Sequence, residues 1–174
     1  FMGGGGRRYP VERSTEPVKM TIKPLPVVGK PEGFTGAVGK YTMDVLAKPT
    51  KLKVGDPITL TINIRGEGNI QTIGEPLLAP EGMKDFKAYN FEAKVTITGR
   101  GRGIKGEKLF NKVIEPQSED SGVIPGISFS YFDPELEKYK TITHAPIPIE
   151  VEHSEIEIPI HLSVLAHGIN LNIF

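Results

Sequence analysis

The side chains that could perform catalysis or bind a metal are few and scattered along the chain. The histidines are His144, His153, His161 and His167, and no pair of them has a spacing typical of a metal site with a carboxylate beside it. No serine lies in a nucleophile-elbow sequence such as G-x-S-x-G. The chain also has no cysteine, which excludes disulfides and thiol chemistry. We therefore expect a non-enzymatic protein with no catalytic residues, no metal site and no cofactor.

The segment Gly99–Gly103 alternates glycine with arginine, as phosphate-binding and nucleic-acid-binding loops often do. It lacks the Lys-Ser/Thr pair and the strand–loop–helix context of a P-loop. The chain has 21 basic and 21 acidic residues, so it has no broad positive field to attract nucleic acid. We expect this segment to be a charged hairpin tip, and we expect no nucleic-acid partner.

Two polar loops are better candidates for binding another protein. One contains Glu67 and Asn69 within a glycine-rich turn, and the other contains Asp133 and Glu135 after an aromatic strand. Binding residues are concentrated in loops that a rigid scaffold positions. We therefore assign Glu67, Asn69, Asp133 and Glu135 as partner-binding candidates and expect the second loop to be exposed and acidic. A purely structural interpretation stays open for both loops, since Asp133 precedes a proline and is well suited to start a turn.

Short strands must position these loops, and the hydrophobic pattern predicts where they lie. After the turn at Val54–Pro57, apolar residues alternate strictly with polar ones along Ile58–Arg65, which is typical of a strand with one buried face. Residues 84–98 also fit a helical stripe. The predicted strands are 41–48, 58–65, 85–90, 91–98, 108–115, 123–132 and 139–151.

Seven short strands separated by glycine and proline indicate an all-β fold, an antiparallel β-sandwich of immunoglobulin-like type with flanking strand segments. The high glycine and proline content, 20 and 15 residues, fits many turns rather than long helices. No window is apolar enough to span a membrane. The side chains expected in the core are Ile58, Leu60, Ile62, Ile64, Val95, Ile97, Phe129 and Tyr131.

Four segments in one order and spacing resemble the BatD family of aerotolerance proteins. They are Phe34–Tyr41, Val54–Pro57, Gly66–Asn69 and Phe129–Pro134, and the resemblance covers roughly residues 34–151. It implies the extracytoplasmic part of a membrane-anchored bacterial protein with immunoglobulin-like domains, on the periplasmic side of the membrane. It also implies neighbouring gene products with von Willebrand A domains and tetratricopeptide repeats, and it brings no catalytic residues.

The ends of the chain carry different patterns from the predicted sandwich at 34–152. Residues 1–8 are expected to be a disordered or added end. Residues 9–33 are expected to be the last strand of a preceding domain followed by a Pro-rich linker, because the pattern around Pro17 repeats around Pro146. Residues 153–174 alternate again and are expected to form a β tail or the start of a further domain. Unpaired strands of this kind favour a homodimer through edge strands.

Together these features favour a non-catalytic protein-protein interaction domain of a bacterial envelope protein. The resemblance points to envelope proteins with von Willebrand A or tetratricopeptide domains as partners, and to membrane attachment only through segments outside this chain. A glycan- or ligand-binding sandwich module and an architectural spacer are the alternatives. The absence of tryptophan disfavours the glycan module, which usually displays aromatic platforms.

Overall fold

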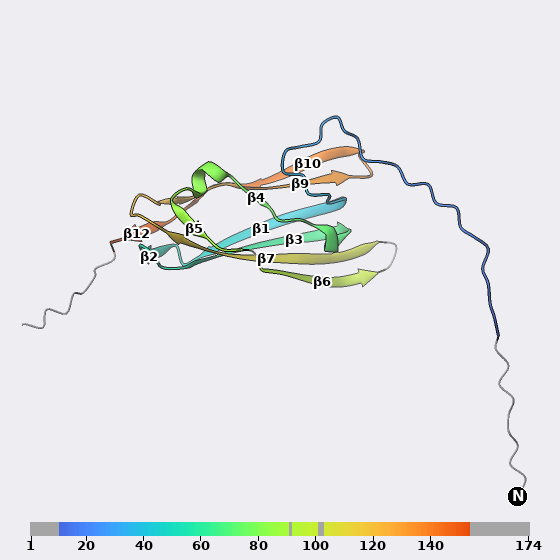
Figure 1. Ribbon diagram of the computed structural model, residues 1–174, viewed down its shortest axis with the longest axis horizontal. Coiled ribbons are helices and arrows are strands. Elements are labelled where there is room, and N and C mark those ends of the chain that lie inside the picture. The colour runs from blue at the N-terminus through green and yellow to red at the C-terminus, as the bar shows by residue number, and fades with distance from the viewer. Residues whose placement is uncertain (1–10, 91, 101–102, 154–174) are drawn as a thin grey trace, which may run out of the picture.

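The computed structural model describes residues 11–90, 92–100 and 103–153, and it forms a β-sandwich (Figure 1). The larger sheet contains five strands: β1 (Gly39–Lys48), β3 (Ile58–Gly68), β7 (Ile104–Pro116), β5 (Phe86–Ala88) and β6 (Glu92–Arg100). Their order is β1-β3-β7, and β7 pairs with β5 along one part of its length and with β6 along another. All pairings in this sheet are antiparallel.

The smaller sheet has the order β10-β9-β4, formed by β10 (Lys138–His144), β9 (Ile127–Asp133) and β4 (Leu77–Leu78). In Figure 1 it forms a second layer beside β1 and β3. Two short pairings close the far end of the sandwich. The strands β8 (Val123–Ile124) and β11 (Ile147–Pro148) pair antiparallel, whereas β2 (Lys51–Lys53) and β12 (Glu150–Glu152) pair parallel.

The prediction of an all-β antiparallel sandwich is confirmed, with the β2–β12 pair as a parallel exception. The helical alternative for 84–98 is wrong, because β5 and β6 occupy that stretch. The predicted strand 123–132 is two strands, since Pro125 lacks an amide hydrogen and Gly126 follows it. The predicted strand 139–151 is likewise three, with the first break at Ala145–Pro146. The strands β6 and β7 that flank the predicted hairpin tip pair antiparallel, while residues 101–102 of the tip lie outside the described residues.

The core lies between the sheets, as the alternation predicted. Ile58, Leu60, Ile62 and Ile64 point inward from β3, and all four are fully buried. They meet Phe129 and Tyr131 of β9, which are also buried. Burying apolar surface of this kind supplies most of the favourable free energy of folding.

Val95 was predicted to be buried, but it is 38% exposed, and Ile97 is only partly buried. The reason is the extent of the smaller sheet. Its strands β9 and β10 contact β1, whereas the main contacts of β6 within the described residues are with its neighbour β7 and with the 3-10 helix η1 (Ile70–Thr72). The inner face of β6 therefore lies largely outside the sandwich.

Residues 11–23 form no strand in the structure and are exposed, including Val18, Met20 and Ile22. The predicted strand is thus not formed within this chain, and its assignment to a preceding domain stays a prediction. The linker that follows is held against the smaller sheet, because Tyr139 donates a hydrogen bond to the carbonyl of Pro26 at 2.7 Å. The ring of Phe34 also packs edge-on against that of Tyr139. Residues 154–174 lie outside the described part of the chain.

A second short 3-10 helix, η2 (Pro80–Met83), connects β4 to β5. Within the described residues there is no helix long and apolar enough to cross a membrane.

Candidate functional site

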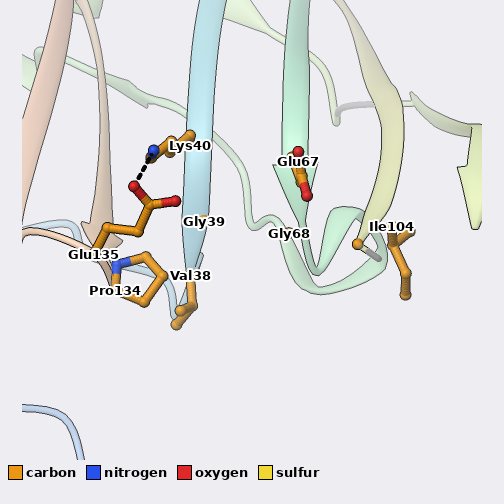
Figure 2. A pocket seen from close by; sticks show the side chains of 9 residues that line it. Val38, Gly39, Lys40, Glu67, Gly68, Ile104, Pro134 and Glu135 are labelled. Carbon is orange, nitrogen blue, oxygen red and sulfur yellow. Dashed lines mark hydrogen bonds and ion pairs between the residues drawn. The ribbon is translucent and has the colours of Figure 1, made fainter. Parts of the chain in front are cut away.

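Five strands bring the predicted loops to one end of the sandwich. Because the strands are antiparallel, the start of β1, the end of β3, the start of β7 and the β9–β10 turn lie together there. They surround a cavity of about 350 Å³. Its lining residues are Val38, Gly39, Lys40, Glu67, Gly68, Gly103, Ile104, Pro134 and Glu135. Figure 2 shows Lys40 and Glu135 on one side of Gly39, with Glu67 and Ile104 on the other.

The two glutamates predicted to bind a partner, Glu67 and Glu135, both line this cavity. Their side chains are 50% and 71% exposed. Each has a lysine beside it: Lys40 Nζ lies 2.5 Å from Glu135 Oε2, and Lys105 Nζ lies 3.5 Å from Glu67 Oε2. The hydrogen bond to Glu135 raises the pKa of Lys40 above its ordinary value. Exposed pairs of this kind are weak and exchange readily with water or with a partner.

Asp133 was predicted to lie in an exposed acidic loop, but it is only 1% exposed. Its Oδ1 accepts hydrogen bonds from the amides of Glu135 and Leu136, at 3.1 and 3.2 Å, and its Oδ2 accepts one from Lys140 Nζ at 3.0 Å. The bond from Lys140, together with these amides, lowers the pKa of the carboxyl. The carboxylate is thus used within the chain to shape the turn that presents Glu135, as the structural interpretation expected.

Asn69 is exposed and lies in an adjoining cavity of about 240 Å³. That cavity is also lined by Ile70, Gln71, Ile97 and Ile104, so Ile104 is shared by both cavities. The backbone of Asn69 is fixed, since its amide donates to the carbonyl of Val38 at 3.3 Å and its carbonyl accepts from Thr72. The structure therefore brings Glu67, Asn69 and Glu135 to one surface.

Lys40 and Ile104 also line this surface, but the sequence did not single them out. Lys40 could have been found from the sequence. The two predicted strands 41–48 and 58–65 pair antiparallel as β1 and β3, and extending their register by one residue beyond Tyr41 places Lys40 opposite Glu67. Ile104 could not have been found in this way. Its exposure depends on where the smaller sheet ends, which the alternation of apolar residues does not encode.

A buried tyrosine fixes the backbone beneath the cavity. Tyr41 donates a hydrogen bond to the carbonyl of Val38 at 2.8 Å, and its ring packs edge-on against Phe129 and Tyr131. Burial raises the pKa of this phenol to about 12. Gly68 lies directly against it: a Cβ added there would be 2.4 Å from the Tyr41 hydroxyl and 2.3 Å from the Val38 carbonyl oxygen. Only glycine allows this approach.

Three of the four sequence segments that carry the family resemblance therefore meet at this end. Phe34–Tyr41 contains the buried Tyr41, and Gly66–Asn69 contains Gly68, whose backbone lies against the Tyr41 hydroxyl. Phe129–Pro134 contains the aromatic rings that pack on Tyr41 and the aspartate that shapes the β9–β10 turn. Val54–Pro57 lies at the opposite end, where the amide of Gly55 donates to the carbonyl of Pro116 at 2.9 Å.

Among the described residues, no group of three or more His, Cys, Asp or Glu side chains is arranged to hold a metal ion. His153 instead lies 2.5 Å from a carboxylate oxygen of Glu119 on the surface. His161 and His167, the other two histidines of the C-terminal region, lie outside the described residues.

The model of one protein family, the BatD DUF11-like domain, matches residues 45–151. No curated protein and no solved structure matches the chain. The matched region begins within β1 and ends within β12, so it takes in the smaller sheet, most of the larger sheet and all of the loop end except residues 38–41. Since this match spans more than half of the chain, the protein belongs to the BatD family.

Proposed function

We propose that this domain is a non-catalytic interaction module of an aerotolerance-type envelope protein, and that it docks von Willebrand A-domain partners through the loop end described above. The family supports the setting, since the BatD DUF11-like domain is non-enzymatic and belongs to proteins of this type. The partner class follows only from the gene neighbourhood that the resemblance implies. The same resemblance supports a position on the periplasmic side of the membrane.

One observation carries the proposal: two exposed carboxylates, Glu67 and Glu135, flank one cavity on a rigid backbone. The strands beneath them are fixed by buried rings and by the close contact at Gly68. A partner would therefore meet a surface that is already ordered, which lowers the entropy lost on binding.

The chemistry of the partner class suggests how the carboxylates act. Von Willebrand A domains often hold a divalent metal whose coordination shell is completed by a carboxylate of the ligand. Magnesium prefers oxygen donors, and one glutamate can supply such a donor. Glu135 and Glu67 are the two candidates that are exposed, whereas Asp133 is engaged in its own turn. In this mechanism the metal belongs to the partner.

The test is a binding titration with the neighbouring A-domain protein, with and without chelator. We expect Glu67→Gln or Glu135→Gln to weaken binding at least about tenfold, because a buried charged contact contributes more than about 1.4 kcal/mol. Glu150→Gln is a matched control, since Glu150 is similarly exposed and lies 3.1 Å from Lys51 at the far end.

An affinity that is unchanged by chelator would exclude the metal-bridged mechanism, but it would not exclude docking at this surface. Equal effects of Glu135→Gln, Glu67→Gln and Glu150→Gln would exclude the docking surface itself. Absence of binding at any concentration tested would exclude this partner class.

A further inference from the structure

The outer face of the larger sheet carries a second cavity, at a place where the edge beside β7 is interrupted. β5 ends at Ala88 and β6 begins at Glu92, so β7 exchanges one edge partner for the other there (Figure 1). The cavity at this interruption has a volume of about 320 Å³, which is within the range of small-ligand sites. Its lining residues are Tyr89, Asn90, Glu92, Asn111, Val113 and Glu115.

Alternation along β7 places this cavity on the face that points away from the core. Ile114 is fully buried in the core. Its neighbours Val113 and Glu115 therefore point to the opposite face, and so does Asn111. Glu92 lies directly opposite Asn111 in the pairing of β6 with β7. The cavity is thus formed by side chains that the packing of the two sheets does not use.

The chain already holds two of the polar lining groups in place. The side-chain oxygen of Asn111 accepts a hydrogen bond from the Thr61 hydroxyl at 3.0 Å, so Nδ2 is the atom of this amide that can donate to a ligand. A carboxylate oxygen of Glu115 accepts a hydrogen bond from the Tyr89 hydroxyl at 2.9 Å. The carbonyl of Tyr89 accepts another from Lys112 Nζ at 2.7 Å. Groups that are ordered before binding lose less entropy when a ligand arrives.

The charges around the cavity balance. Two carboxylates line it, those of Glu92 and Glu115, and two lysines lie beside its tyrosine. Lys87 Nζ lies 3.6 Å from Glu115 Oε2 and 5.0 Å from the centroid of the Tyr89 ring. The carboxylates disfavour an anion, and an organic cation would compete with Lys87 for both the ring and Glu115. The arrangement therefore favours a neutral polar ligand.

We propose that this cavity binds one pyranose ring of a neutral saccharide. Tyr89 borders the cavity on a side that Lys87 does not cover, since Lys87 is not one of the lining residues. Its aromatic ring offers an apolar surface to the C–H face of the sugar. Sugar hydroxyls both donate and accept, so they match the carboxylate of Glu92 and the amides of Asn90 and Asn111.

This site is separate from the loop end. Val113 lies nine residues along β7 from Ile104 (104 to 113), which is about 30 Å at the rise of a strand. Saccharide binding is therefore a property additional to the docking proposed above. The lack of tryptophan disfavours an extended glycan platform, but a site for a single ring needs only one aromatic side chain.

Two-dimensional amide NMR of the full chain tests the proposal, with glucose, N-acetylglucosamine, maltose and cellobiose as the probes. With at least one of these sugars we expect saturable shifts of the Asn111 side-chain amide and of the backbone amides of Tyr89 and Val113, with a millimolar Kd. Tyr89→Ala and Asn111→Ala should each weaken binding at least about tenfold, because each removes a contact to the sugar. Tyr89 is 41% exposed, so we expect Tyr89→Ala to fold like the wild type.

Asn63→Ala is the matched control for Asn111→Ala. Asn63 also lies on the outer face and donates to Glu107 at 3.1 Å, but it does not line the cavity. It should bind the sugar as the wild type does, and so should Glu67→Gln at the loop end, which separates this proposal from the docking one. The proposal would be overturned if none of the four sugars shifted the cavity amides, or if Tyr89→Ala bound as well as the wild type. Shifts caused by tetramethylammonium in place of the sugars would also overturn it, since they would identify a site for organic cations.

Discussion

Replacing Gly68 with alanine tests whether the glycine-rich family segment has a structural role beneath the candidate site. Gly68 has a φ of +148°, a conformation that residues with a side chain rarely adopt. A Cβ there would lie 2.3 Å from the carbonyl oxygen of Val38 and 2.4 Å from the hydroxyl of Tyr41. Neither atom can move away easily, because one belongs to the backbone and the other is held in the core.

Gly55→Ala is the matched control. Gly55 also has a positive φ, +85°, but a Cβ there would meet no atom within 4 Å. In Gly55→Ala the free energy of unfolding should fall only by the cost of holding a non-glycine residue at positive φ, about 1–2 kcal/mol. Gly68→Ala should lose a similar term and, in addition, about 1–3 kcal/mol for overpacking. We therefore expect a total loss of roughly 2–5 kcal/mol for Gly68→Ala, the sum of the two ranges.

Denaturant unfolding followed by tyrosine fluorescence would measure both free energies of unfolding. The reasoning requires Gly68→Ala to lose clearly more stability than Gly55→Ala. Equal losses for the two variants would refute it, because the clash with Tyr41 and Val38 would then contribute nothing.

Three further predictions concern the core, the loop that covers it and the turn at the site. Leu60→Ala should cost about 2–5 kcal/mol, because the side chain is fully buried, and Thr61→Ala about 0.5–1.5 kcal/mol for one lost hydrogen bond; equal losses in urea unfolding would show that the faces are reversed. Lys108→Met should expose the η1 turn to faster backbone hydrogen exchange, since Lys108 Nζ bonds two carbonyls there at 2.6 and 3.2 Å; unchanged exchange would show that these bonds do not hold the turn. The lowered pKa of Asp133 stabilises the fold above the unfolded pKa of about 3.9, and that contribution disappears as pH falls through the folded value. The stability advantage of the wild type over Asp133→Asn should therefore be constant above about pH 5 and shrink below about pH 4, and an advantage that grows on acidification would contradict this assignment.

The long strands could be predicted from the sequence because apolar and polar residues alternate along a strand that has one buried face. Ile58–Ile64 of β3 alternate in the sequence and are buried in the structure. Val95 belongs to an equally regular pattern and is exposed, because alternation identifies the two faces of a strand but not the extent of the sheet that covers one of them. The parallel β2–β12 pair at the far end depends on contacts between residues about 100 positions apart, as between Lys51 and Glu150.

The candidate site was predictable to a similar degree. Loop residues at the ends of a sandwich can be named from turn chemistry, and Glu67 and Glu135 do share one cavity. Whether a loop carboxylate faces solvent depends on its own hydrogen bonds, and Asp133 is occupied by two amides and a lysine. A sequence shows that aspartate suits a turn. It does not show whether the carboxylate of Asp133 bonds within its own turn or is free to bind a partner.

Backbone hydrogen exchange, measured with and without a saturating A-domain partner, tests the docking of that partner at the loop end most directly. We predict slower exchange in residues 38–40, 67–68 and 103–104 and at Glu135, which line the cavity between Glu67 and Glu135. The opposite end, at 54–57 and 117–120, should be unchanged and serves as an internal control. Protection confined to the opposite end, or to β6, would contradict the account, as would a bound complex with no protection around the cavity.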